Sequence, residues 1–248
     1  MKPVRLFYVL TLLGISLSLT VQGQEGEPPS SATTTLEASL ARLNDVITDR
    51  PSPQHHLRAE VFFRLGRFKE AITDYDVAAA LGSPHDDYSC WERGLAQYYA
   101  GDFAAGAAQF ARYHEVGATD IENGLWRLLC IAEEKGLKAA RESMFTYPSR
   151  RRPPFPALLD LYLGTGNVDA VFEATQADGL SPGEQTNRRF YAHYYVGKYY
   201  ELMGEQDKAR AEIEKALKQP LRHFMYFCAE ADAKRLAETS ETPEPAIE

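Results

Sequence analysis

Apolar residues recur at every third or fourth position from Leu36 to about residue 237, with polar residues between them. That period places the apolar side chains on one face of successive α-helices. The region contains no sustained alternation of apolar and polar residues, which is the pattern of a surface strand. The pattern therefore predicts an all-α chain with one helical domain over residues 36–237.

Polar segments flank this domain. Residues 24–35 are rich in Pro, Ser, Thr and Glu and predict a flexible linker. Residues 238–248 combine two prolines with several acidic residues and predict a disordered acidic tail.

Residues 1–23 have the pattern of a secretory signal peptide. Lys2 and Arg5 precede an apolar run from Leu6 to Leu19, and Val21 and Gly23 then fit a cleavage site. The run is shorter than the roughly 20 apolar residues that span a bilayer, which favours cleavage over an uncleaved anchor. We therefore expect an exported protein, periplasmic or secreted, without a stable membrane span after cleavage.

A short turn recurs within the helical region. Gly66, Gly101 and Gly204 each follow a helix rich in Tyr, Phe and Leu, and an Ala-containing helix begins shortly afterwards; Gly164 marks a looser copy. Glycine adopts the left-handed backbone conformation that ends a helix at little steric cost. Helix pairs of this kind cannot bury their apolar faces alone, so neighbouring pairs are expected to stack.

These copies resemble the tetratricopeptide repeat (TPR) family, over residues of about 55–84, 90–118 and 190–220. The matching positions are Ala59, Phe62, Gly66 and Ala71 in the first copy, Gly94, Gly101 and Phe103 in the second, and Gly197, Tyr200, Gly204, Ala209 and Ala216 in the third. The resemblance implies antiparallel helix pairs stacked into a right-handed superhelix. Residues 120–180 are helical but degenerate as repeats, and residues 222–236 predict a capping helix. With the signal peptide, the resemblance is to an exported bacterial TPR protein.

The net charge of the chain limits the classes of partner that it is expected to bind. A formal net charge of −8 disfavours nucleic acid and anionic membrane surfaces, which attract Lys and Arg. Arg150, Arg151 and Arg152 form the one basic cluster. They could dock an acidic partner segment or an anionic surface, or lie on a solvated loop.

Candidate chemistry is sparse. No sequence pattern of a nucleophile, a phosphate loop or a metalloprotease occurs, so we expect no catalytic residue, metal or cofactor. Cys90, Cys130 and Cys228 lie in apolar helical contexts and are expected to be buried thiols, with one disulfide and a spare thiol as the alternative. Metal ligation near His85 is conceivable, but capping of the helix that holds Trp91 by Asp86 or Asp87 is favoured.

The resemblance also implies a function. TPR proteins bind peptides or protein surfaces along a concave groove, so we expect an adaptor or scaffold with a protein or peptide partner. Arg64, Tyr98 and Tyr194 are the candidate groove residues, with ordinary packing between helices as the alternative. A helical-solenoid enzyme acting on envelope polymers, marked by a concave cluster of carboxylates, is a second possibility. A self-assembling protein with residues 36–48 in a homodimer is a third.

Overall fold

The structure of the protein is a computed structural model that describes residues 31–47, 50–221 and 223–241. Over these residues the chain forms twelve helices and no strand, which confirms the predicted all-α class. In chain order they are α1 (Ser31–Val46), α2 (Gln54–Arg64), α3 (Phe68–Leu81), α4 (Trp91–Tyr99), α5 (Phe103–Val116), α6 (Ile121–Lys135), α7 (Leu137–Glu142), α8 (Phe155–Leu163), α9 (Val168–Glu173), α10 (Pro182–Leu202), α11 (Gln206–Leu217) and α12 (Phe224–Glu241).

The expected repeats are present as helix pairs. Gly66, Gly101 and Gly204 have φ angles of 75°, 78° and 77°, the left-handed conformation that their turns require. Within the pairs, a Cβ on Gly94 would lie 2.8 Å from the Phe110 ring, and one on Gly197 would lie 2.7 Å from the Ile213 side chain. Only glycine lets the paired helices approach this closely.

Residues 120–180, which match the family pattern poorly, also form helix pairs. Helix α6 pairs with α7, and α8 pairs with α9, so the described residues hold five successive helix pairs from α2 to α11. Helices α7 and α9 have only six residues each, too short to carry the second half of a repeat pattern. This explains why residues 120–180 match the family pattern poorly.

Some boundaries differ from those expected. The predicted signal peptide lies outside the described residues, but the last part of the predicted linker is helical, because α1 begins at Ser31. Leu40 of α1 is buried and Leu36 packs against the core, and a helix held by packing extends into polar residues at its end. Helix α12 likewise runs on to Glu241, into the predicted tail. The role of α1 in a homodimer stays a prediction.

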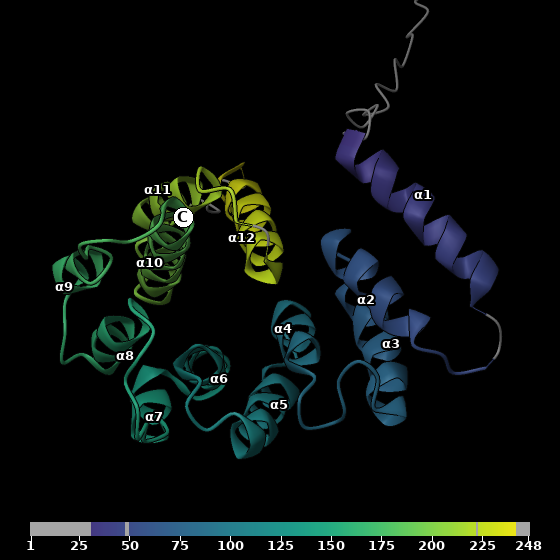
Figure 1. The fold of residues 1–248 in the computed structure, drawn as a ribbon, viewed down its shortest axis with the longest axis horizontal. Coiled ribbons are helices and arrows are strands. Elements are labelled where there is room, and N and C mark those ends of the chain that lie inside the picture. The colour runs from purple at the N-terminus through teal and green to yellow at the C-terminus, as the bar shows by residue number, and fades with distance from the viewer. Residues whose placement is uncertain (1–30, 48–49, 222, 242–248) are drawn as a thin grey trace, which may run out of the picture.

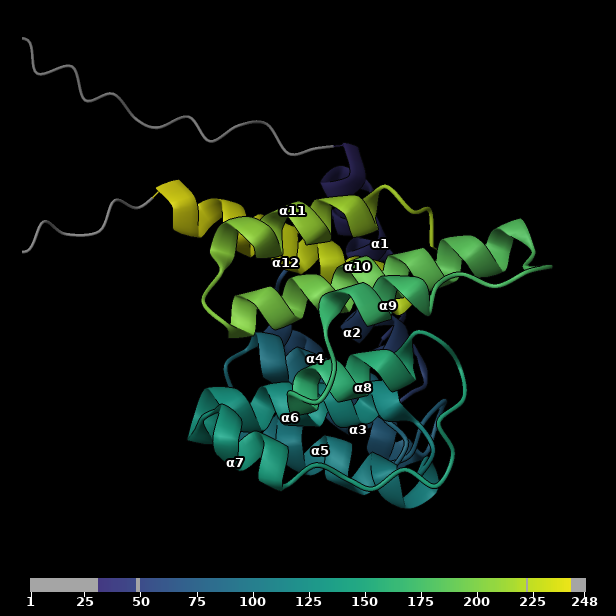
Figure 2. The same cartoon turned by 90° about the vertical axis from the view of Figure 1, so that its left-hand side faces the viewer.

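The helix pairs follow a closed curve (Figures 1 and 2). The first helices of the pairs lie toward its centre, and the second helices lie outside. Helix α12 returns to the beginning of the curve, where the Phe224 ring lies 4.7 Å from that of Phe63 in α2 and 5.4 Å from that of Trp91 in α4. None of the helices described here is long and apolar enough to cross a membrane.

Candidate functional site

The three candidate groove residues all face the inside of the curve, and the chain itself occupies that space. The Arg64 guanidinium lies 4.2 Å from the Phe227 ring of α12, and the Tyr194 hydroxyl donates to Asp232 of α12 at 3.0 Å. The Tyr98 ring lies 4.9 Å from the Lys198 ammonium. Arg64 is exposed, whereas Tyr98 and Tyr194 are only 8% and 0% exposed. The expectation that these two tyrosines line an open groove is wrong, because the superhelix closes around α12.

A network of buried charges holds α12 in place. The Lys198 ammonium donates to Asp232 at 3.0 Å and to Glu201 at 2.9 Å, and Lys198 and Asp232 have no exposed side-chain surface. Tyr99 of α4 donates to the second Asp232 oxygen at 2.8 Å. Burial alone would raise the pKa of Asp232, but the charges of Lys198 and Arg235 lower it below its ordinary value. These contacts join α4, α10 and α12, and the Lys198 and Asp232 side chains at their centre are out of reach of a ligand.

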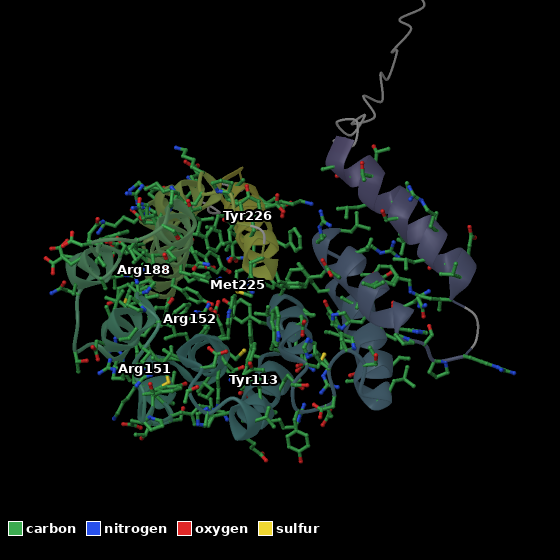
Figure 3. The ribbon with its side chains drawn as sticks, in the orientation of Figure 1. Tyr113, Arg151, Arg152, Arg188, Met225 and Tyr226 are labelled. Atoms are coloured by element: carbon green, nitrogen blue, oxygen red, sulfur yellow. The ribbon has the colours of Figure 1, made fainter. Side chains whose placement is uncertain are left out.

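The open surface lies elsewhere, around Arg152. Three cavities, of about 190, 310 and 420 Å³, are each lined by this residue, and we call them together the Arg152 groove. Figure 3 shows Arg151, Arg152 and Arg188 on the α7–α10 side of the molecule, with Tyr113 and Met225 toward α5 and α12. The first cavity is lined by Trp91, Leu95, Phe110, Tyr113, Asp120, Glu122, Asn123, Trp126, Arg152, His223 and Met225. The second is lined by Thr119, Asp120, Ile121, Ser149, Arg151, Arg152 and Phe155, and the third by Arg152, Pro153, Gly183, Glu184, Asn187 and Arg188.

The loop before α8 positions Arg152. Pro153 and Pro154 follow it and prevent a helix there. Arg152 has a φ of 69°, a left-handed conformation that is costly for a side-chain-bearing residue. Its guanidinium donates to Glu122 at 2.9 Å and lies over the Phe155 ring at 4.4 Å, contacts that offset this cost.

Glu122 is the buried acid of the groove. One carboxylate oxygen accepts from Arg152, and the other accepts from the Tyr195 hydroxyl at 2.9 Å. Burial raises the pKa of Glu122 to about 7, although the charge of Arg152 opposes the shift. Asp120 caps the start of α6 and lies 3.9 Å from the Arg152 guanidinium. Two carboxylates therefore share one arginine.

The cavity of about 190 Å³ is lined by aromatic side chains as well as by the charged groups around Arg152. His223 stacks on Trp91 with ring centres 6.2 Å apart, and desolvation within the cavity lowers the pKa of His223. Asn123 and Trp126, which also line it, carry a buried side-chain oxygen and nitrogen without a hydrogen-bond partner. This end of the groove suits a flat or apolar group with a polar edge.

The three arginines of the predicted basic cluster, Arg150, Arg151 and Arg152, have different roles. Arg150 donates to Asp160 at 2.6 Å and Arg152 binds Glu122, so both are structural. Arg151 is exposed and Arg188 is half-buried, and neither forms an ion pair with another described residue. No local sequence pattern indicated Arg188 or the aromatic cavity, because the residues that form them are far apart in the chain.

The remaining candidates are structural. Cys90, Cys130 and Cys228 are buried free thiols, as expected, and no disulfide joins them. Burial raises the pKa of Cys90 to about 12. Within the described part of the chain, no cluster of metal-ligating side chains is present.

The predicted cap on α4 is wrong. Asp86 accepts from the backbone of Ser89 at 2.8 Å and so closes the turn before the helix, while Asp87 binds Arg93. The residue before α4 is Cys90, whose side chain makes no capping bond. The turn begins too early for either carboxylate to reach the first free amides of α4.

The comparisons with known proteins concern the fold alone. No protein-family model matches this chain. It is similar to the crystal structure of a tetratricopeptide repeat protein from Parabacteroides merdae, with 13% identity and a TM-score of 0.44 over 83% of this chain and 79% of that one. The turns and packing described above make this chain an all-α protein of stacked, TPR-like helix pairs.

Proposed function

We propose that this chain is a binding protein, an adaptor or scaffold, that holds an extended segment of a protein partner in the Arg152 groove. One observation carries the proposal: three cavities share Arg152, and they run from the inner helices α4 and α6 beside α12 to the loop before α8 and the start of α10. Helical repeats characteristically present extended surfaces to their partners. Because fold alone does not determine function, the site carries the proposal.

The proposed localisation of the protein rests on the sequence pattern of its N-terminus. The positive start and apolar run of residues 1–23 support export to the periplasm or the extracellular space. A scaffold of the cell envelope or secreted space is consistent with the positive start and with the apolar run.

Site-specific photo-crosslinking tests this proposal. A benzophenone amino acid replaces exposed Asn187, which lines the groove, and in a control variant it replaces exposed Glu214 of α11, which lines none of the three cavities. After irradiation of cells that express each variant, a discrete protein adduct is expected with the label at 187 and not at 214. Adducts at both positions, or at neither, would refute the groove as the binding surface.

A second candidate, an enzyme acting on envelope polymers, is favoured by Asp120 and Glu122 in one cavity. The raised pKa of Glu122 suits a general acid near neutral pH. Both of its oxygens are engaged, however, and this makes it a poor catalyst as placed. Release of soluble fragments from purified peptidoglycan, lost in Glu122→Gln, would support the enzyme; equal release by both proteins, or none, would eliminate it.

A further inference from the structure

We propose that the segment bound in the Arg152 groove is acidic and carries one aromatic or large apolar side chain. This inference rests on the proposed function and adds the chemistry of the partner. The acidic residues would lie between Arg151 and Arg188, and the apolar side chain would enter the cavity beside Trp91.

The charges of the outer groove favour an acidic ligand. Arg151 and Arg188 line neighbouring cavities and have no ion-pair partner among the described residues. The carboxylates that line these two cavities have other hydrogen-bond partners: Glu184 accepts from the Ser181 hydroxyl at 2.7 Å and from its backbone at 2.9 Å, and Asp120 accepts from the backbone of Glu122. Neither guanidinium therefore forms a hydrogen bond or close ion pair with a described carboxylate, although the charge of Arg188 acts on Glu184, and the chain has a net charge of −8.

The shape of the outer groove allows carboxylates to reach these groups. The two outer cavities, of about 310 and 420 Å³, meet at Arg152, and Ser149 and Asn187 supply further hydrogen-bond donors. Gly183 leaves open space where other residues would place a side chain. Guanidinium groups bind carboxylates through paired hydrogen bonds, so these two arginines fit two acidic side chains.

The inner cavity distinguishes a peptide from a simple polyanion. Trp91, Phe110 and Trp126 give this cavity apolar walls, and the carboxylates of Asp120 and Glu122, which also line it, disfavour a phosphate chain or an acidic polysaccharide there. A peptide can place an aromatic side chain there and acidic residues along the arginines. Because Arg152 lines all three cavities, the two kinds of residue would be close together in the partner sequence.

Fluorescence anisotropy with the full chain tests this inference. The probe is a short labelled peptide in which Asp and Glu residues flank one central Phe, and two further probes replace the acidic residues by Lys or the Phe by Ser. The protein variants are Arg188→Glu and its neighbour Arg189→Glu, an exposed arginine that lines none of the cavities. Both make the same charge change in the same helix, and circular dichroism checks that both fold.

We expect the acidic Phe peptide to bind the wild type more tightly than either altered peptide. Its dissociation constant should rise at least about tenfold in Arg188→Glu and change little in Arg189→Glu. Equal binding of the Lys peptide, equal loss in both variants, or a Ser peptide that binds as well and is displaced by inorganic phosphate would overturn the inference. If the acidic peptide fails to bind while the label at 187 still captures a partner, this inference falls and the proposed function stands.

Discussion

At the scale of single residues, the Lys198–Asp232 pair is the most sensitive point of the fold. Both side chains are removed from water, and each compensates the charge of the other at 3.0 Å. Three aromatic rings, those of Tyr98, Tyr99 and Trp126, lie within 6 Å of the ammonium. A buried pair of this kind adds little over apolar packing while intact, but removing one partner leaves a buried charge that only its second partner, Glu201 for Lys198 or Arg235 for Asp232, still compensates.

Asp232→Ala should therefore lower the free energy of unfolding by about 3–5 kcal/mol, measured by urea denaturation. The control is Lys208→Ala, which removes an exposed ion pair with Glu205 and should cost less than about 1 kcal/mol. A loss in Asp232→Ala no larger than in the control would mean that the buried lysine is not charged.

Glu122 predicts a dependence of stability on pH. Its pKa rises from the ordinary 4.5 to about 7 on folding, so between these values the folded chain holds a proton that the unfolded chain has released. The stabilisation that the proton gives is complete below about pH 4.5 and is lost as the pH rises through about 7. The loss is on the order of 3 kcal/mol.

Urea unfolding of the wild type and Glu122→Gln at pH 4.5 and pH 8 measures this effect. Because Gln does not ionise, the wild type should lose stability relative to the variant as the pH rises. A difference between the two proteins that is the same at both pH values would contradict the raised pKa.

At the scale of elements, α12 does more than cap the last repeat. It packs on α11, but its inner face also contacts α2 through Phe63, α4 through Tyr99 and α10 through Tyr194. A terminal helix held from one side frays readily, whereas one held from several sides opens only with the surrounding core.

Tyr99→Phe tests the link between α4 and α12. The change removes a hydroxyl that donates to Asp232 and leaves the ring in place, at a cost of about 1.5–3 kcal/mol. Amide exchange measured by mass spectrometry should quicken in α12 and in α4. Tyr113→Phe removes a hydroxyl 3.5 Å from Asp120 and should not change exchange in α12; similar exchange in both variants would show that the link is unimportant.

The elements also show how far the sequence could predict this structure. The turns at Gly66, Gly101 and Gly204 were predictable because each depends on a few adjacent residues. The position of α12 was not predictable. Its contacts with Phe63 and Tyr99 depend on the total rotation that accumulates from one helix pair to the next, and no local sequence pattern encodes that total. For the same reason the sequence predicted Tyr98 and Tyr194 as binding residues and missed most of the Arg152 groove. Of the groove residues, only Arg151 and Arg152 belong to a motif that can be seen in the sequence.

At the scale of the whole molecule, closure of the superhelix decides which surface can bind a partner. An open superhelix would expose Tyr98 and Tyr194, whereas the closed one buries them and leaves the Arg152 groove accessible. Closure brings the two ends of the repeat series together through the Phe224 ring, which lies against Phe63 and Trp91. A charge at this position would lose its hydration among aromatic rings, so it should favour the open form.

Phe224→Asp should therefore increase the radius of gyration measured by small-angle X-ray scattering, because α12 leaves the first two repeats. The matched control is Phe172→Asp, which also places a charge at a half-buried ring, next to His193, but between successive helices that do not close the curve. That variant should keep the radius of the wild type. If both variants stay helical by circular dichroism and Phe224→Asp has the wild-type radius, the Phe224 contacts do not hold the superhelix closed, and the buried charges around Asp232 must hold it alone.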